Sequence, residues 1–379
     1  MRLDFRAFAA AALFALLPAA AAGGALALPV LVSLTGALNF RPAQLQQAVT
    51  GRPLWLATLL LAGAWIAASA AWSPAPDTTA AKLGSQLILG LLFVAGGAAA
   101  GRTFRAAGAA AFLVLASLLA VEAAFGFPLN RAIHPEATPE MVALNPTRGA
   151  LVLLALSWGA AGGMLASGRR RLGLAILALS GALSLPFGVS AHALGFAVGL
   201  AAFGLTFLAP RVTLLAVSGG LAGWILAAPF ATPFLSRLAG PLPFSWEHRL
   251  AIWAQTCGEI WRAPWFGHGL GASRALPGVA VAGQMTYPPL HPHSASLQLW
   301  YETGAIGAAL AALALVAGGH ALARALGDKP AAAAAAAASL LSLGFIANVS
   351  FSLWAEWWVA SLLIAASLTA AAAQRPNAL

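Results

Sequence analysis

Residues 149–167 read GALVLLALSWGAAGGMLAS and contain no charged side chain. A helix needs about 20 mostly apolar residues to cross the hydrocarbon core of a membrane. A run of this length without a charge therefore predicts a membrane-spanning helix. Comparable runs recur along the chain, and they predict an all-α, polytopic bundle of membrane helices.

The overall composition leads to the same fold class. Of the 379 residues, 61% are hydrophobic and 8% are charged, and the mean hydropathy is +0.85. A soluble domain carries about 25% charged residues, so this chain has too few to cover a water-exposed surface. The net charge of +10 fits basic residues at cytoplasmic helix ends and does not predict a nucleic-acid partner. The single cysteine excludes an internal disulfide framework and a cysteine-based metal cluster.

Hydropathy predicts about twelve spans in three regions. We expect residues 1–229 to form an N-terminal bundle of about nine helices, 230–294 a large loop on the non-cytoplasmic side, and 295–379 about three C-terminal helices. The start resembles a signal peptide, and we interpret it as an uncleaved first helix because further spans follow at once. Gly23, Gly24 and Pro29 leave open whether the first two ranges form a hairpin or one broken element. The expected spans are 7–22, 24–38, 54–71, 84–101, 106–125, 148–167, 171–186, 190–209, 211–229, 295–317, 331–349 and 352–373.

Charge placement orients this map in the membrane. With a cytoplasmic N-terminus, 13 of the 20 Lys and Arg residues fall on cytoplasmic segments and 7 on the outer segments, which are longer in total. The positive-inside rule favours this orientation. Both termini are then cytoplasmic, and the 230–294 loop lies outside.

Two outer segments are long, and long ordered loops are uncommon unless they have a function. They cover residues 126–147 and 230–294. Within the second, residues 246–261 predict an amphipathic helix that lies against the membrane face. Trp354, Trp357 and Trp358 fit an aromatic belt at the outer interface. The residues of the amphipathic helix at helical spacing are Leu250, Trp253, Ala254, Cys257, Ile260 and Trp261.

The segment that leads from the loop into the tenth expected span holds the most informative polar residues. His293 lies at the mouth of that span and His291 beside it. Gln298 and Glu302 are four residues apart, so they share one helix face. A carboxylate inside a span is costly to bury and is by default a functional or pairing residue. For Glu302 we expect a structural role, either pairing with Arg249 or accepting hydrogen bonds from the bundle.

A second polar segment runs Glu247-His248-Arg249 and is followed by the glycine-rich stretch from Pro264 to Gly271. Backbone N–H groups in a glycine-rich turn can approach an anion. The alternative is that this stretch is a turn that binds no ligand.

These residues carry a family resemblance. The pattern Arg249-x-x-Ile-Trp, Pro264-x-x-Gly267-x-Gly269 and His293-x-x-x-Leu297-Gln298-x-x-x-Glu302-x-Gly304-x-x-Gly307 resembles the O-antigen ligase and polymerase superfamily (the WaaL and Wzy types). The stretch Ser69-Ala-Ala-Trp72-Ser73-Pro74 also resembles it. The motifs cover about residues 245–310, and the remainder agrees in topology and in the place of the outer loop.

The resemblance implies a glycosyltransferase of lipopolysaccharide biosynthesis in the bacterial inner membrane, with its site on the periplasmic face. Such an enzyme moves an oligosaccharide or polysaccharide from undecaprenyl diphosphate to lipid A-core or to another glycan. It inverts the anomeric centre and needs no metal or other cofactor. By this resemblance His293 is the general base and Arg249 holds the diphosphate, with His291, Gln298 and Glu302 in support.

One departure from the family pattern concerns a second arginine. Ligases of the family carry it just after a serine near the outer end of the eighth helix, where this chain has Ser190-Ala-His192. His192, Arg148 and Arg274 are the candidates for the missing phosphate contact.

Several alternatives stay open at the level of sequence. A polymerase differs from a ligase only in its acceptor. A transporter or flippase would place its polar cluster near the middle of the membrane, whereas a glycan transferase of this type places it at the outer face. Arg249 can also be an interfacial residue that pairs with lipid or Glu247. His291 and His293 can bind a metal only with a third ligand, which the spacing does not supply.

Overall fold

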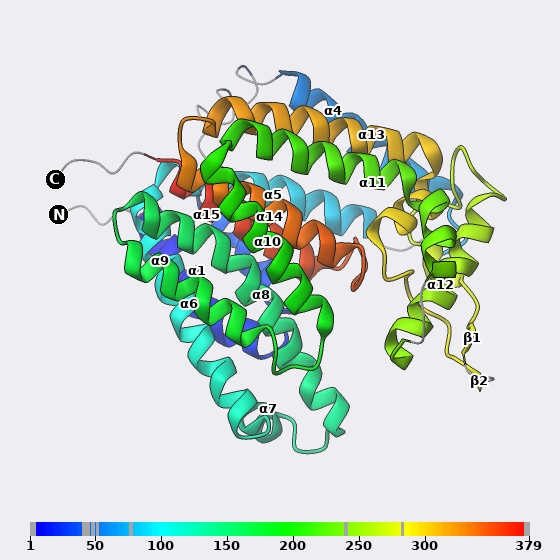
Figure 1. The fold of residues 1–379 in the computed structure, drawn as a ribbon, viewed down its shortest axis with the longest axis horizontal. Helices are drawn as coiled ribbons and strands as arrows, with labels where there is room; N and C mark the ends of the chain where they lie inside the picture. The colour runs from blue at the N-terminus through cyan, green and yellow to red at the C-terminus, as the bar shows by residue number, and fades with distance from the viewer. Residues whose placement is uncertain are drawn as a thin grey trace.

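The computed structural model describes residues 5–39, 46, 50, 53–75, 79–238, 242–281 and 284–374. Arg2, Arg41, Arg52 and Arg375, four of the residues assigned to the cytoplasmic side, lie outside these ranges. The described chain is a bundle of helices with a smaller lobe on one side (Figure 1).

A helix occupies each range in which a span was expected. Eight of the described helices are long and apolar enough to cross a membrane, three apolar helices are shorter, and α9 has 14 residues. The fold is therefore a polytopic helical bundle, and the number of spans stays a prediction. The helices are α1 (Phe5–Ala22), α2 (Leu28–Leu38), α4 (Pro53–Ser69), α5 (Thr79–Ala99), α6 (Gly101–Ala124), α8 (Pro139–Ala166), α9 (Arg170–Leu183), α10 (Ser190–Leu208), α11 (Pro210–Leu238), α13 (Ala295–Leu326), α14 (Pro330–Ala347) and α15 (Glu356–Ala372).

Several helix boundaries differ from the expected ones. The segment 126–147 is not a loop, because it contains α7 (Pro128–Ile133) and the first turns of α8. Helix α8 begins early because the Thr138 side chain accepts a hydrogen bond from the Met141 N–H and Pro139 occupies its first position. Helix α11 continues through Pro229 and Pro233 to Leu238, nine residues beyond the expected end.

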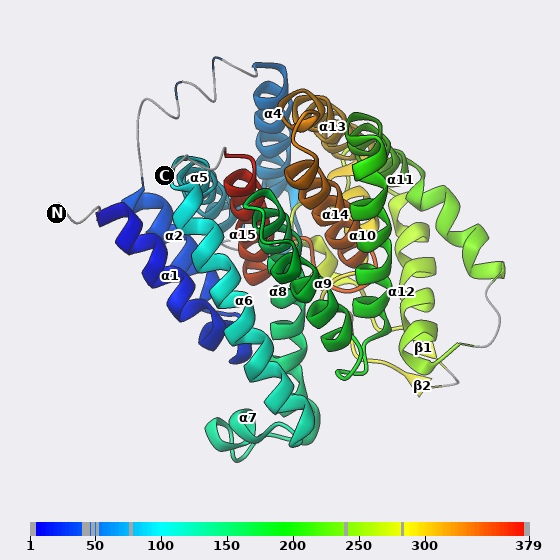
Figure 2. The same ribbon diagram turned by 60° about the vertical axis from the view of Figure 1, so that its left-hand side comes forward.

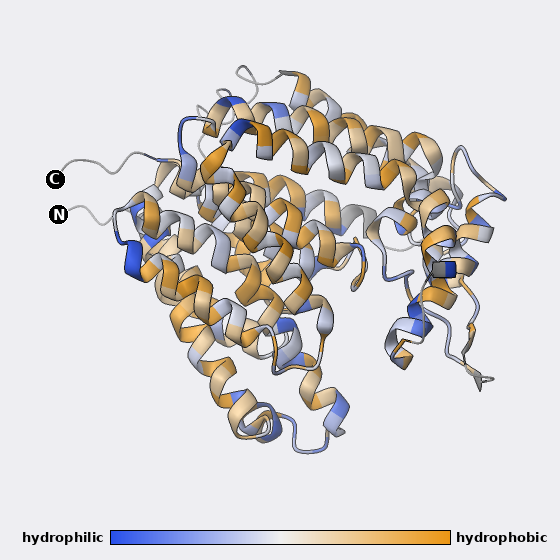
Figure 3. Cartoon of the chain, in the orientation of Figure 1, coloured by the Kyte–Doolittle hydropathy of each residue, from blue (hydrophilic) through white to orange (hydrophobic). Residues whose placement is uncertain are grey.

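The core lies around α8. This helix packs against α1, α6, α9, α14 and α15, and 89% of its most apolar window is buried. Trp158 of α8 and Trp358 of α15 are fully buried there. The helices α4, α13 and α11 form an outer layer, in which the most apolar window of α4 is only 17% buried (Figure 1). Figure 3 shows that the helices are mostly hydrophobic along their length, and exposed apolar residues on such helices suit a lipid environment.

Successive helices alternate between two ends of the bundle. At one end, Gln86 at the start of α5 donates to the Glu356 carbonyl at the start of α15, and Asn130 of α7 donates to the Ala22 carbonyl at the end of α1. At the other end, Arg105 of α6 donates to the Ala371 carbonyl near the end of α15. In Figure 2, α7 and the hairpin of β1 and β2 lie at the same end, which we call the loop end.

The segment between α11 and α13 confirms the expected amphipathic helix as α12 (Phe244–Ile260). Its buried residues are Ile252, Thr256, Cys257 and Ile260, and it packs against α11 and α13, whereas the expected Ala254 and Trp261 are exposed. The buried side of α12 packs on protein, and its position against the membrane face stays a prediction. The short elements η1 (Ala70–Trp72), η2 (Ala272–Ala275) and the antiparallel strands β1 (Ala280–Val281) and β2 (Gln284–Met285) complete the described elements.

Candidate functional site

Helix α13 is interrupted at Gly304, and a turn of the loop fills the interruption. Gly304 has φ 66° and ψ −171°, which is not helical. The Tyr301 and Glu302 carbonyls accept hydrogen bonds from the His268 and Gly269 N–H groups, both at 2.8 Å. The Ala305 N–H donates to the Pro264 carbonyl at 2.8 Å. The glycine-rich turn thus binds the backbone of α13, so these two of its N–H groups are not available to an external anion.

The glycines of this turn are required by close approach. A Cβ at Gly267 would lie 2.5 Å from the Glu302 carbonyl carbon, and one at Gly269 would lie 2.4 Å from Ser73 Cα. Both residues also have positive φ. The Ser69–Pro74 stretch that ends α4 is therefore in direct contact with the turn, where the Leu270 N–H donates to the Ser69 carbonyl.

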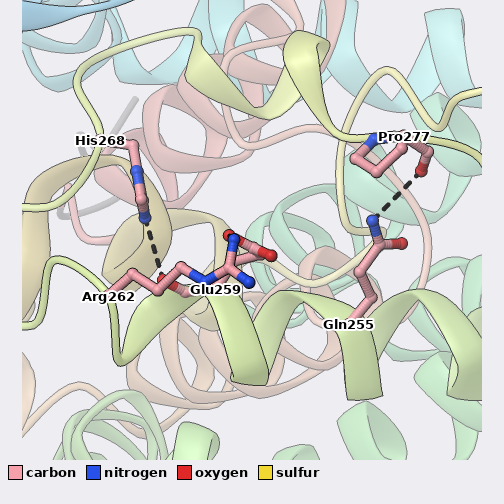
Figure 4. A network of polar contacts seen from close by, with 5 residues as sticks. All are labelled: Gln255, Glu259, Arg262, His268 and Pro277. Carbon is pink, nitrogen blue, oxygen red and sulfur yellow. Dashed lines mark hydrogen bonds and ion pairs between the residues drawn. The ribbon is translucent and has the colours of Figure 1, made fainter.

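The turn is also tied to the end of α12, as Figure 4 shows. The His268 Nε2–H donates to the Glu259 carbonyl at 3.0 Å, because a carbonyl can only accept. Arg262 pairs with the Glu259 carboxylate at 3.0 Å, and Gln255 donates to the Pro277 carbonyl at 3.3 Å. Helix α12, the turn and the break in α13 therefore form one connected unit.

The carboxylate of Glu302 is fully buried and accepts four hydrogen bonds. Oε2 accepts from the Gly271 N–H at 2.8 Å and from Trp354 Nε1 at 2.6 Å. Oε1 accepts from Ser273 Oγ at 2.5 Å and from Gln298 Nε2 at 3.1 Å. Four neutral donors thus satisfy the hydrogen-bonding capacity of the buried carboxyl group. Glu302 therefore has the hydrogen-bonding role, and Arg249 is not its partner among the described residues.

Gln298 connects this network to the segment between α14 and α15. Its Oε1 accepts from the Leu353 N–H at 2.8 Å, and its Nε2 also donates to Ser352 Oγ at 3.1 Å. At the other end of the segment, Asn348 Oδ1 accepts from the Ser296 N–H at 3.1 Å. The irregular stretch 348–355 is thus fixed against α13.

The two histidines before α13 lie against this stretch. His293 Nδ1 is 2.5 Å from the Ser350 carbonyl, and the His293 N–H donates to His291 Nδ1 at 3.1 Å. Because a carbonyl only accepts, His293 Nδ1 carries a proton and the neutral ring has its lone pair on Nε2. The neutral His291 ring has the opposite tautomer, with Nε2–H as a donor. His293 has φ 55°, a strained value for a residue with a side chain, and such strain concentrates at functional sites.

Burial keeps both imidazoles neutral. It lowers the pKa of His291 to about 3, with smaller contributions from the charges of His293 and Arg249. Burial also lowers the pKa of His293 below its ordinary value; the hydrogen bond to Ser350 opposes this, and the charges of Arg249 and His248 add to it. His293 is therefore a free base near neutral pH.

Arg249 faces the same region from α12. Its guanidinium lies 5.4 Å from the Trp246 ring centroid, and Nη1 donates to the Ser245 carbonyl at 2.7 Å. One turn further along α12, Trp253 Nε1 donates to the Pro292 carbonyl at 2.9 Å, between the two histidines. Burial lowers the pKa of Arg249, which stays protonated near neutral pH. Its buried Nε has no hydrogen-bond partner among the described residues.

His192 lies on α10 at the same end. It is 1% exposed, and neither ring nitrogen has a partner in the described part of the chain. A Cβ at Gly199 would lie 2.8 Å from Ser342 Cβ, and one at Gly195 would lie 2.6 Å from Ile346 Cδ1. Helices α10 and α14 therefore run antiparallel, with Gly195 beside Ile346. His192 lies about one turn before Gly195, so it is level with residues 349–350. An unpartnered buried polar group costs about 1–3 kcal/mol, so the position favours a polar ligand.

The other two phosphate candidates differ. The Arg148 guanidinium lies 5.8 Å from the Trp357 ring centroid, and Trp357 packs edge-on to Phe351, the neighbour of Ser350. Arg148 Nε is buried without a partner among the described atoms. Arg274 is exposed on η2, next to Ser273, and carries an interaction of its own. Arg148 is thus linked to the stretch before α15 through Trp357 and Phe351, and Arg274 lies on the surface.

Some residues were assigned wrongly from the sequence or not assigned at all. Trp357 and Trp358 are buried, so their assignment to an aromatic belt is wrong. Trp354 is half-buried and donates to Glu302. The roles of Ser350 and Ser273 were missed, because a backbone carbonyl and a loop hydroxyl leave no signal in a single sequence. Among the described residues, no group of three or more His, Cys, Asp or Glu is arranged to hold a metal ion.

Comparison with known proteins gives matches over the same region. Residues 188–312, which include α10, α11, α12, the turn and the break in α13, match the family model described as O-antigen ligase. The chain is 29% identical over 232 residues to a protein of Rickettsia conorii described as a candidate polysaccharide ligase; the match covers 56% of this chain and 54% of that protein.

A similar protein of Rickettsia felis is 29% identical over 238 residues, covering 56% of this chain and 55% of its own length. The chain thus spans about half the length of the curated relatives it matches. The matched region holds Arg249, His293 and Glu302, the residues on which the motif resemblance was based. Residues 188–312 are therefore similar to the O-antigen ligase superfamily in both comparisons.

Proposed function

We propose that the chain is a membrane glycan transferase of the O-antigen ligase type. It transfers a glycan from an undecaprenyl diphosphate-linked donor to an acceptor hydroxyl on lipid A-core or another glycan. The observation that carries the proposal is the neutral His293, with its Nε2 lone pair, beside the charged Arg249 at one end of the bundle.

The proposed reaction is a single displacement. The acceptor O–H loses its proton to His293 Nε2 as its oxygen attacks C1 of the donor sugar. The bond between C1 and the phosphate oxygen breaks, and the diphosphate leaves with the electron pair. Attack opposite the leaving group inverts the anomeric centre. A positioned base contributes about 10²–10⁴ in rate.

Charge on the leaving diphosphate is stabilised by fixed donors. Arg249 supplies a planar guanidinium with donors to spare, which suits two phosphate oxygens at once. His291 supplies an Nε2–H, and His192 and Arg148 are the proposed contacts in place of the second family arginine. Because these residues supply the donors, the proposed chemistry needs no metal ion.

The proposed location is the bacterial inner membrane, with both termini cytoplasmic and the loop end periplasmic. The excess of Lys and Arg on the segments at the opposite end supports this orientation. The polar site at the loop end, rather than in the middle of the helices, favours a transferase over a transporter or flippase. The twelve-span count and the three-region division are part of the same proposal.

The direct test is transfer in a reconstituted assay with a lipid-linked donor. We expect His293→Ala to reduce kcat by at least about 10²-fold, because the proton has no acceptor. The kcat of Arg249→Lys should fall by a comparable factor, because an ammonium group does not replace the planar guanidinium with its paired donors. His134→Ala is the control, since His134 is exposed on the α7 side of the loop end. Full activity of His293→Ala removes His293 from its role.

The acceptor separates a ligase from a polymerase of the same superfamily. Cells that lack the gene are compared by electrophoresis of their lipopolysaccharide and capsule. Loss of ligated ladder with accumulation of lipid-linked glycan identifies a ligase. Products with a single repeat unit identify a polymerase instead.

A further inference from the structure

One carboxylate joins three separate segments of the site. Glu302 of α13 binds the loop through Gly271 and Ser273, and it binds the stretch before α15 through Trp354. Within α13 it also accepts from Gln298, which itself holds the Leu353 N–H. The loop and the stretch 348–355 are thus bound to the same pair of side chains.

The stretch 348–355 carries the group that determines the state of His293. The Ser350 carbonyl accepts the proton on His293 Nδ1, and this contact leaves Nε2 free to act as a base. A carbonyl can hold that tautomer only where its backbone is fixed. Glu302 fixes it at Trp354, four residues beyond Ser350, and Gln298 fixes it at Leu353, three residues beyond Ser350.

We infer that Glu302 is a positioning residue, which holds His293 in its Nδ1–H tautomer through Trp354, Gln298 and the Ser350 carbonyl. Glu302 touches no reacting atom in this role. The expected effect on glycan transfer rests on the proposed function. The His293 tautomer does not, because it can be measured without substrate.

The hydrogen-bonding pattern shows why an amide cannot replace the carboxylate. Oε2 faces the Gly271 N–H and Trp354 Nε1, which can only donate, so the oxygen of a new amide must stay on that side. Its NH₂ then faces Ser273 Oγ, which can accept a hydrogen bond, and Gln298 Nε2, which cannot. If Gln298 turns its own oxygen toward that NH₂, it loses the bond to the Leu353 N–H. Glu302→Gln therefore releases the stretch at Leu353.

The experiment is ¹⁵N NMR of histidine-labelled, detergent-solubilised full-length protein, in which the shifts of the two ring nitrogens report which one carries the proton. His293→Asn assigns the His293 signals. We expect an Nδ1–H ring in the wild type and a mixture with a substantial Nε2–H share in Glu302→Gln. Transfer in the same preparation should fall by about 10–100-fold, as when a group that orients a functional histidine is removed.

A second variant covers the case in which Glu302→Gln does not fold. Trp354→Phe removes one of the four bonds to Glu302 and leaves the carboxylate with three donors. It should shift the tautomer in the same direction. The matched control is Glu122→Gln on α6, since Glu122 is also fully buried and accepts from the Leu129 N–H and Asn130 Nδ2, both at 2.8 Å.

The outcomes separate the inference from the proposed function. Folded Glu302→Gln or Trp354→Phe protein that keeps the wild-type tautomer overturns the inference, as does an Nε2–H ring in the wild type. An equal shift in Glu122→Gln shows a general loss of structure and also overturns it. A shifted tautomer with unchanged transfer supports the positioning role and refutes His293 as the base.

Discussion

The break in α13 provides a sharp test through Gly304→Ala. The φ of 66° and ψ of −171° lie in a region that only glycine occupies readily, and a side chain there costs about 1–3 kcal/mol. The new Cβ would lie 2.3 Å from the Trp265 carbonyl carbon and oxygen and 2.6 Å from the Phe266 nitrogen. These are backbone atoms that cannot rotate away, so the turn must move.

Moving the turn breaks the bonds that it makes across the interruption. The Ala305 N–H loses the Pro264 carbonyl at 2.8 Å, and the Ile306 N–H loses the Trp265 carbonyl at 3.4 Å. Each bond contributes about 0.5–1.5 kcal/mol. Together with the backbone strain, the free energy of unfolding should fall by about 2–6 kcal/mol.

The assay is equilibrium unfolding in mixed detergent micelles, followed by tryptophan fluorescence. Gly204→Ala is the matched control, because a Cβ at Gly204 meets nothing within 4 Å. Gly204 lies inside α10, so its replacement should stabilise the protein by about 0.5–1 kcal/mol. A Gly304→Ala protein within about 0.5 kcal/mol of the wild type, where surface changes normally fall, would refute the proposed fit of turn and helix.

Two further predictions concern titration. Burial, and then the charges of Arg249 and His248, hold the pKa of His293 below 6.5, so kcat/KM should be full at neutral pH and fall only as the pH drops through a value below 6.5. Arg249→Gln removes one of those charges, so the fall in its residual kcat/KM should occur at a higher pH than in the wild type. A wild-type fall centred above pH 6.5, or a fall at lower pH in Arg249→Gln, contradicts the assignment of His293 as the base. Burial raises the pKa of the Cys257 thiol to about 11, so maleimide should label the folded protein at pH 8 far more slowly than the unfolded protein. Equal labelling rates would show that Cys257 is not buried.

Much of the helical pattern could be predicted from the sequence, because hydropathy is a local property of a run of residues. A helix occurs in each expected range, and the amphipathic residues 246–260 lie within α12. Boundaries were less predictable. Pro229 and Pro233 lie within α11, and Thr138 and Pro139 start α8 inside a segment expected to be a loop. Such helix ends depend on caps and on packing against neighbouring helices.

The residues of the candidate site were proposed from the sequence, whereas their connections come only from the structure. Arg249, His293 and Glu302 follow from motif spacing. That Glu302 binds Trp354 and Ser273, or that His293 faces the Ser350 carbonyl, depends on contacts between residues 29 to 57 positions apart. A single sequence carries no record of such pairs.

By itself, the sequence determined that the chain folds as a bundle of apolar helices, and where its charged and chemically useful side chains lie along it. It could do so because the free energy of transferring an apolar run from water into a membrane is a sum over the residues of that run. Only the tertiary structure decided that the glycine-rich turn fills a broken helix, and which nitrogen of His293 carries a proton. Both depend on hydrogen bonds between residues far apart in the sequence, whose polar groups must be satisfied once they are buried together.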